Sequence, residues 1–370
     1  VYKRQGLNSL VSASTSGSRG YRENTDFRSH HAYYHGSFSQ SSWNPQLMLG
    51  VNRRAFGANA FYTPRFPEQY EETTTAFGAL KGERSLGRGH WKGQAYLRMN
   101  RDHFLLDRDQ PSFYQNDHLS QVFGADLETR LSWTGGISRL GLSYRSEGIR
   151  STSLGEELEA PKEAWFNGSI SFSHGVRRDL LNARANHSWQ GGPLSLSGGF
   201  LVYMDPARME NSGIYPGLDA RLQVAPAWRI HASVNRSMRL PTFTDLYYQG
   251  PTNQGNPDLA AEKAWSYEAG ISRRLPGQSW QLALNGWFRK GRDLIDWVWL
   301  EDERWYTMNF SRVNSMGAEW LLAYEPARTP GAWLHVRRAQ LSVSMGHQQK
   351  LEEEYDSRYL LDYLKYKAVF

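Results

Sequence analysis

The strongest constraint on the fold is an alternation of apolar and polar residues that recurs along the whole chain of 370 residues. In residues 121–133, for example, Phe123, Ala125 and Leu127 occupy every second position between polar residues. A period of two is typical of a β-strand with one apolar and one polar face. Segments of this kind number roughly fifteen to seventeen, and each is near the ~10 residues that a tilted strand needs to cross a bilayer. The sequence therefore predicts an all-β protein.

The connections between these segments alternate between short turns and long polar excursions. Short turns with Gly or Pro are predicted near residues 43, 88, 135, 191, 226, 276 and 330. Long polar excursions are predicted at 18–28, 54–72, 103–117, 148–163, 204–214, 239–261, 293–304 and 348–357. Short turns at one end and long loops at the other are typical of outer-membrane barrels. We therefore expect a transmembrane antiparallel up-and-down β-barrel.

Composition agrees with that expectation. The mean hydropathy is −0.65, and no apolar run approaches the ~18 residues of a membrane helix. Taken alone, these two observations would fit a soluble protein. The chain nevertheless carries 14 Trp, 20 Tyr and 16 Phe, and Trp and Tyr are enriched at membrane interfaces. A barrel reconciles the two, because only every second residue of its strands meets lipid.

The main alternative is a soluble all-β protein such as a propeller or stacked sandwiches. A propeller would show a repeat of roughly 40–50 residues, and none is found. Sandwich strands are commonly only about five or six residues long. The net charge of +6 is spread over the chain, whereas nucleic-acid readers concentrate basic residues on one face, so we expect no nucleic-acid partner. With no cysteine, disulfides, zinc–thiolate sites and cysteine nucleophiles are excluded.

The polar face of the predicted strands indicates what the barrel encloses. It contains Arg, Glu, Asp and Asn residues, which are costly against lipid and belong in a wet or plugged lumen. Sixteen or more strands also enclose a space too wide for side chains alone to fill. The barrel is therefore expected to be a pore or to surround a plug.

One long excursion carries a recognisable set of residues. It lies between the alternating segments that start at Trp228 and end at Arg274. The set is Arg239, Pro241, Leu246, Tyr247, Gly255, Asn256, Pro257, Leu259, Glu262, Glu268 and Gly270. In order and spacing it resembles the mid-barrel signature of TonB-dependent outer-membrane receptors. Residues 55–73, 288–297, 309–314 and 359–365 are similar to the same family, in its Bacteroidetes-type form and closest to its cobalamin branch.

The resemblance implies a fold and a function. Receptors of this family have an N-terminal plug and a barrel of twenty-two strands, and they are energised by TonB–ExbB–ExbD through the plug. Residues 1–370 are expected to be a partial barrel domain without the plug and without the last strands. The implied location is the outer membrane, in contact with its lipid. A surface lipoprotein is a further implied partner.

The implied activity is uptake of a scarce, bulky nutrient, with cobalamin as the first choice and a ferric siderophore or haem as the alternative. A passive porin is the alternative from another class. No enzyme is expected, because no G-x-S-x-G, H-E-x-x-H or phosphate-cradling loop is found. No covalently bound cofactor is expected either.

Aromatic residues in or near the long excursions are the candidate ligand contacts, because planar or ring-shaped ligands stack on aromatic rings. The candidates are Phe61, Tyr62, Tyr70, Tyr114, Tyr247, Tyr248 and Trp297. Part of this aromatic set could instead form the membrane girdle. For the signature residues we favour an architectural role over ligand contact, with Arg239 paired to Glu262 or Glu268 inside the wall.

Metal sites are not supported by spacing. On a strand, His31 and His35 would share a face at a separation of about 13 Å, which is too far for one coordination shell. The sets 107–109 (Asp-Arg-Asp) and 156–157 (Glu-Glu) could hold calcium in a loop, since carboxylates are its usual ligands. A solvated charge cluster is the alternative that we favour.

Overall fold

The computed structural model describes residues 6–39, 42–250, 252–274, 279–300, 304–325, 338–350, 356–357 and 364–370. Its first half contains β1 (Leu7–Ser18), β2 (Phe27–Phe38), β3 (Gln46–Gly57), β4 (Tyr70–Leu86), β5 (Gly89–Leu105), β6 (Gln115–Trp133), β7 (Gly136–Ser151), β8 (Glu156–Ala164) and β9 (Asn167–Gly191). The second half contains β10 (Leu194–Met204), η1 (Met209–Asn211), β11 (Gly213–Ala225), β12 (Trp228–Arg239), α1 (Phe243–Tyr247), β13 (Asn253–Gln254), β14 (Glu262–Arg274), β15 (Trp280–Trp299), β16 (Trp305–Tyr324), β17 (Ala339–Lys350), β18 (Asp356–Ser357) and β19 (Tyr366–Val369).

The strands form one curved sheet of nineteen strands in which chain neighbours pair antiparallel. Three exceptions interrupt the simple order: β8 pairs only with the start of β9, the two-residue β13 pairs parallel with β16, and the two-residue β18 pairs with the end of β15. Within the described part of the chain, β1 pairs only with β2 and β19 only with β17. The expected antiparallel up-and-down barrel wall is confirmed, and its described portion is an open sheet.

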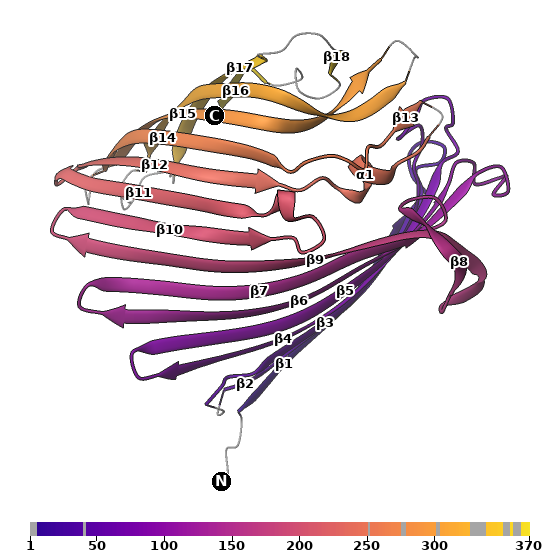
Figure 1. Cartoon of the computed structure of the whole chain (residues 1–370), viewed down its shortest axis with the longest axis horizontal. Coiled ribbons are helices and arrows are strands. Elements are labelled where there is room, and N and C mark those ends of the chain that lie inside the picture. Colours follow the sequence, from indigo (N-terminus) through magenta and orange to yellow (C-terminus); the bar gives the residue numbers. More distant parts are fainter. Residues whose placement is uncertain are drawn as a thin grey trace, which may run out of the picture.

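Short and long connections separate cleanly to the two ends of the wall, as predicted (Figure 1). At the left end of the figure, two residues join β4 to β5, β6 to β7, β9 to β10 and β11 to β12. Gly87 and Gly192 in these turns have φ of 56° and 54°, a conformation that glycine adopts without steric cost. The predicted hairpins at 275–277 and 329–331 lie outside the described residues.

Two of the predicted long excursions are wrong in extent. Residues 294–299 continue β15 and pair with β16, leaving only 300–304 as a connection. In 148–163, β7 runs on to Ser151 and β8 forms a hairpin with β9. The strand residues within 148–163 are mostly polar, because a strand that rises above the membrane keeps its ladder hydrogen bonds but no longer needs an apolar face. Residues 294–299 are instead mostly apolar and lack the period-two alternation.

The register places the apolar residues of successive strands on one face. Leu97 lies opposite Phe123, and Leu127 lies opposite Leu142. These side chains are 43–62% exposed, so the protein itself does not bury them. A continuous exposed apolar face is typical of a wall that meets lipid. We call it the outer face and the other the lumen face.

Two aromatic belts bound the outer face. The belt near the short turns contains Trp91, Trp133, Trp189, Trp228, Trp280 and Tyr324, and the belt near the long loops contains Phe123, Tyr144, Trp265, Tyr267 and Phe288. On β6, Phe123 and Trp133 are ten positions apart, about 25 Å along the barrel axis for a strand tilted by ~40°. That height matches the lipid-facing band of an outer-membrane barrel. None of the candidate ligand aromatics falls in either belt.

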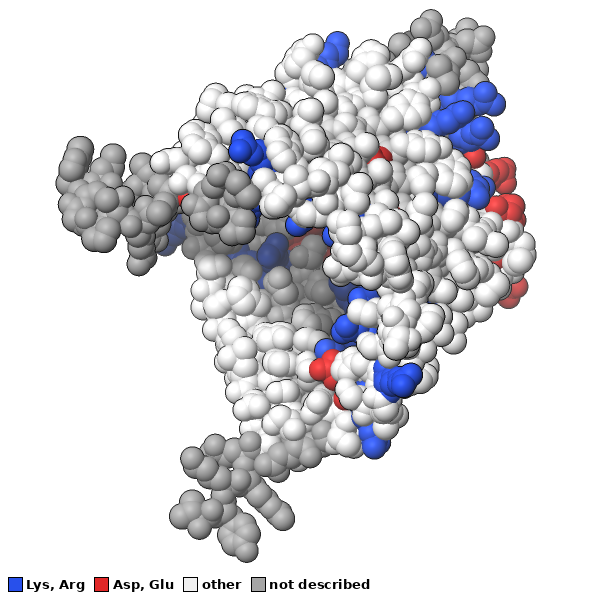
Figure 2. Space-filling model, turned by 90° about the vertical axis from the view of Figure 1, so that its left-hand side faces the viewer, with Lys and Arg blue, Asp and Glu red and all other residues white. Residues whose placement is uncertain are grey.

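The lumen face lines a deep hollow. Figure 2 looks into it from the end with the short turns and shows Lys and Arg side chains on its wall, with fewer acidic ones. Among the described helices, none is long and apolar enough to span a membrane. The long loops lie at the opposite end of this hollow from the short turns, and we call that end the outer mouth. The signature segment is one of these loops.

Candidate functional site at the outer mouth

The signature segment, residues 240–261, leaves β12 and first forms the short helix α1. Thr242 caps this helix: its side chain accepts a hydrogen bond from the Asp245 N–H, and the Asp245 carboxylate accepts one from the Thr242 N–H. This reciprocal capping box satisfies two donors that a helix start leaves free. Pro241, directly before it, is almost fully buried. The local sequence therefore fixes the direction in which the segment turns into the mouth.

An ion pair closes the base of the segment. The Arg239 guanidinium donates to the Glu262 carboxylate at 2.6 Å, and it lies 3.4 Å from the Asp245 carboxylate. Glu262 is 6% exposed and also accepts the Ile295 N–H at 2.8 Å. Of the two predicted partners, Glu262 is thus the one that pairs with Arg239. Glu268 lies 3.6 Å from His231 on the lumen face, beside the signature glycine Gly270 on β14.

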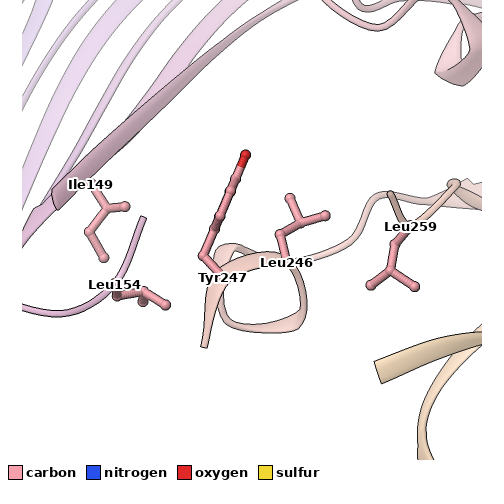
Figure 3. Packing of buried hydrophobic residues seen from close by; sticks show 5 residues of the cluster. All are labelled: Ile149, Leu154, Leu246, Tyr247 and Leu259. Atoms are coloured by element: carbon pink, nitrogen blue, oxygen red, sulfur yellow. The ribbon is translucent and has the colours of Figure 1, made fainter. Parts of the chain in front are cut away.

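The tip of the segment packs against strands that are far away in the sequence. Leu246 and Tyr247 of α1 and the following Leu259 form a buried cluster with Ile149 and Leu154, which come from β7 and the loop after it. Figure 3 shows Tyr247 standing between Leu246 on one side and Ile149 and Leu154 on the other. The Tyr247 hydroxyl donates to Glu156 at 2.9 Å, and burial raises the pKa of this phenol. The segment therefore reaches from β12 to β7.

The return path is held by side-chain amides. Asn309 of β16 donates to the Ala260 carbonyl and accepts from the Ala260 N–H, while Asn211 accepts from the Ala261 N–H. Gly255 passes so close to α1 that an added Cβ would lie 2.8–2.9 Å from backbone atoms of the helix. Asn256 donates its N–H to the Asp245 carbonyl, and the Pro257 carbonyl accepts from Arg208. These contacts fit the architectural role that we favoured.

Sequence reasoning missed the residues that receive the segment. Arg178 of β9 donates to the Pro241 carbonyl at 2.8 Å, pairs with Glu147 of β7 and lies 4.9 Å above the Phe243 ring. Thr307 of β16, fully buried, donates to the Asp245 carbonyl. No local pattern marks these residues, because their partners lie some 60 positions away in the chain. For the β16 residues that receive the segment, the sequence offered one indication, the resemblance of residues 309–314 to the receptor family.

The predicted ligand aromatics divide into two groups. Phe61 and Tyr62 pack edge to face in the loop between β3 and β4, where Phe61 is 75% and Tyr62 58% exposed. The Tyr62 hydroxyl donates to Glu71 at 2.7 Å and its ring contacts Phe104. Burial and the hydrogen bond to Glu71 raise the pKa of Tyr62. Tyr70, the first residue of β4, is instead covered by the Arg108 guanidinium at 4.6 Å.

The second group comes from three different elements. Tyr248 after α1 packs edge to face on Trp297 of β15. Tyr114 precedes β6 and lies near enough to Tyr248 to contribute to raising its pKa, after the larger effect of burial. Tyr114 is 43% and Tyr248 37% exposed. The structure thus brings Tyr114, Tyr248 and Trp297 together, while Tyr247 is buried in the cluster and whether any of them contacts ligand stays a prediction.

The candidate calcium residues have protein partners. The Asp107 carboxylate accepts the N–H groups of Asp109 and Gln110, as in a turn. Arg108 pairs with Asp26 at 2.6 Å, and this hydrogen bond holds the pKa of Asp26 below its usual value. Glu156 accepts from Tyr247, as described above. Calcium binding by these loops therefore stays a prediction.

Comparison with known proteins places the chain in a family. The TonB dependent receptor-like, beta-barrel family matches residues 3–363, and the chain belongs to that family. Its location is the outer membrane. No curated protein matches the sequence.

Solved structures share the fold at low identity. A siderophore receptor, PirA from Pseudomonas aeruginosa, is 14% identical with a TM-score of 0.72, and the alignment covers 94% of this chain and 61% of that one. The copper transporter OprC is 12% identical with a TM-score of 0.70, covering 93% and 57%. The FrpB iron transporter from Neisseria meningitidis is 16% identical with a TM-score of 0.67, covering 94% and 58%. The chain thus spans about three fifths of the length of these structures.

Proposed function

We propose that this barrel belongs to a receptor that imports a scarce, bulky, metal-bearing nutrient with energy supplied by TonB–ExbB–ExbD through a plug. Family membership supports this class over a passive porin. The proposed cargo is an anionic ferric chelate of the siderophore type. Cobalamin, which the sequence resemblance favours, is the second candidate, and haem is a third.

The lumen face carries the cargo argument. Arg98 on β5, Arg221 on β11 and Arg289 on β15 fall on this face by register, and all three are exposed. Within the part of the chain that the structure describes, none of them has an acidic partner. Basic walls around a hollow attract anions, because a cleft of one charge sign raises the local concentration of the opposite sign. The names of the similar structures, a siderophore receptor and iron and copper transporters, support the same direction.

The outer mouth offers contacts for a cargo with planar groups. Phe61 and Tyr62 form one exposed aromatic pair, and Tyr114, Tyr248 and Trp297 form a second group. Aromatic faces and edges bind ring systems as well as cations. We propose these residues as first contacts of the cargo. Loop calcium and a surface lipoprotein remain accompanying proposals for the full-length receptor.

The test is ligand titration of the full-length receptor with a ferric tris-catecholate, cobalamin and haemin. We expect saturable binding of the ferric chelate, weakened about tenfold by Arg98→Gln and about tenfold by Arg221→Gln, since a hydrogen bond to a charged group is worth about 1.5 kcal/mol or more. Arg150→Gln on the outer face of β7 is the matched control and should bind normally. If only cobalamin bound saturably, cobalamin would replace the ferric chelate as the proposed cargo. Uptake that persists without TonB would favour a passive porin.

A further inference from the structure

Four cations gather on the outer face of β14, β15 and β16. The register places Lys263 directly opposite Arg292, and Arg292 directly opposite Arg312. Lys290 lies on the same face of β15, two residues nearer the membrane and opposite Trp265. We call Lys263, Lys290, Arg292 and Arg312 the cationic patch.

Such a row is unfavourable by itself. Residues directly opposite on neighbouring strands have Cβ atoms only about 5 Å apart, and like charges in these positions destabilise a sheet. No described residue forms an ion pair with any member of the patch. The acidic residues nearest to it on β14, Glu262 and Glu268, lie on the lumen face beside Arg239 and His231.

Several other cations on the outer face above the loop-end belt have acidic partners, although Arg150 of β7 has none among the described residues. Arg53 pairs with Glu72 at 2.8 Å, Arg177 with Asp179 at 3.0 Å, and Arg101 lies 3.7 Å from Asp117. The wall from β3 to β9 therefore neutralises several of its own cations, whereas none of the four patch residues has an acidic partner among the described residues. The difference indicates that the patch on β14–β16 is neutralised by something outside the described protein.

The position of the patch relative to the loop-end aromatic belt indicates which anion neutralises it. Trp265 and Phe288 of the loop-end belt are two residues below Lys263 and Lys290, which is about 5 Å along the barrel axis. Aromatic belts sit at headgroup level, so the patch lies where lipid phosphates are found. From this we propose that the cationic patch binds the phosphate-bearing headgroup of an outer-leaflet lipid. The proposal goes beyond cargo uptake and does not depend on it.

Lipid rather than a dissolved anion is favoured by the neighbouring side chains. Trp265 is 36% exposed directly beside Lys290, and Tyr267 stacks on it further toward the membrane. An acyl chain can lie along these rings while its phosphate meets the cations above, and the long Lys and Arg side chains reach the headgroup in the same way. A dissolved phosphate would use the cations alone.

The test uses the full-length receptor in nanodiscs of zwitterionic lipid with phosphatidic acid as the probe. The variant combines Lys263→Gln, Arg292→Gln and Arg312→Gln. The control is Arg130→Gln on β6, which lies on the lumen face and outside the proposed cargo contacts. Each cation near an anionic surface contributes about a fivefold affinity, so the triple variant should retain phosphatidic acid roughly a hundredfold less well in native mass spectrometry, and the control should match wild type.

A second measurement shows that the variant is folded and separates repulsion from binding. In zwitterionic lipid alone, the triple variant should melt at the same temperature as wild type or higher, because opposing cations have been removed. With phosphatidic acid, wild type should gain thermal stability and the triple variant should not. Equal retention by the triple variant, or full displacement of the lipid by soluble pyrophosphate at equal concentration, would overturn the proposal.

Discussion

Two loops at the outer mouth, the signature segment 240–261 and the connection 58–69, use their residues in opposite ways. The first sends Leu246, Tyr247 and Leu259 into a buried cluster and is held by strands on several sides. The second is anchored near its ends by buried Ala58 and Gln69 and by the hydrogen bond from Tyr62 to Glu71, and it exposes the Phe61 ring at its tip. The residues that identify the family are therefore fixed in place, and the exposed aromatic tip is the better candidate for meeting a ligand.

The largest expected effect comes from breaking the base of the signature segment. Glu262→Ala removes the partner of Arg239 and leaves the Ile295 N–H unsatisfied. Breaking a buried pair costs 3–5 kcal/mol, and because the Arg239 side chain is 45% exposed we expect about 2–3 kcal/mol, measured by denaturant unfolding in detergent. Glu268→Gln, at a signature glutamate that is half exposed, is the control and should change stability by less than about 0.5 kcal/mol. An equal loss of unfolding free energy in both variants would contradict the conclusion that Glu262, and not Glu268, holds the base of the segment.

A somewhat smaller effect is expected where the segment passes its own helix. Gly255→Ala places a methyl group within 2.8–2.9 Å of the backbone of α1, and overpacking of this kind costs about 1–3 kcal/mol. We expect the strain to appear as faster hydrogen exchange in residues 240–261 while the β3–β6 wall is unchanged. Gly168→Ala, where an added Cβ meets nothing within 4 Å, is the matched control. An unchanged exchange rate in the Gly255 variant would mean that the segment can move away from α1.

The second loop should behave in the reverse manner. Phe61→Ala removes a ring that is 75% exposed, so stability should change by no more than about 0.5 kcal/mol. Loss of one stacking or edge contact should weaken cargo binding about three- to tenfold, the equivalent of ~1 kcal/mol. The measurement is the same titration used for the arginine variants. Normal affinity would remove the 58–69 loop from the candidate site.

The contrast also shows what could be predicted from sequence. Period-two alternation located most strands, since one face of each must meet lipid whatever its neighbours are. It could not choose between Glu262 and Glu268, because a long loop does not fix the register of the strand that follows it. The observed register places Arg239 opposite Glu262 and leaves Glu268 opposite Ser233.

Contacts between distant elements could not be predicted from the sequence either, because local sequence does not determine which strands the loops reach. Trp297 was expected in a loop because acidic and basic residues surround it, yet Asp296 beside it is 3% exposed and the strand continues through both. Arg178 shows nothing unusual on β9 until the curvature of the wall brings Pro241 to it. Such contacts depend on the shape of the whole barrel rather than on any local pattern.

The smallest expected effect concerns the contact that ties the loops before β2 and before β6 together. The hydrogen bond from Arg108 lowers the pKa of Asp26 below 3.8. A carboxyl whose folded pKa is lowered contributes stability that is complete above its unfolded pKa near 4 and is lost as the pH falls through the folded pKa. Because the Asp26 side chain is 41% exposed, the contribution should stay below about 1 kcal/mol.

Hydrogen exchange of residues 19–26 and 106–114 should therefore accelerate several-fold between pH 5 and pH 3 relative to exchange in the signature segment, after correction for intrinsic rates. Asp26→Asn should show the faster rate already at pH 5 and lose the pH dependence, whereas an acceleration that persists in this variant would assign the effect to other carboxyl groups of the rim.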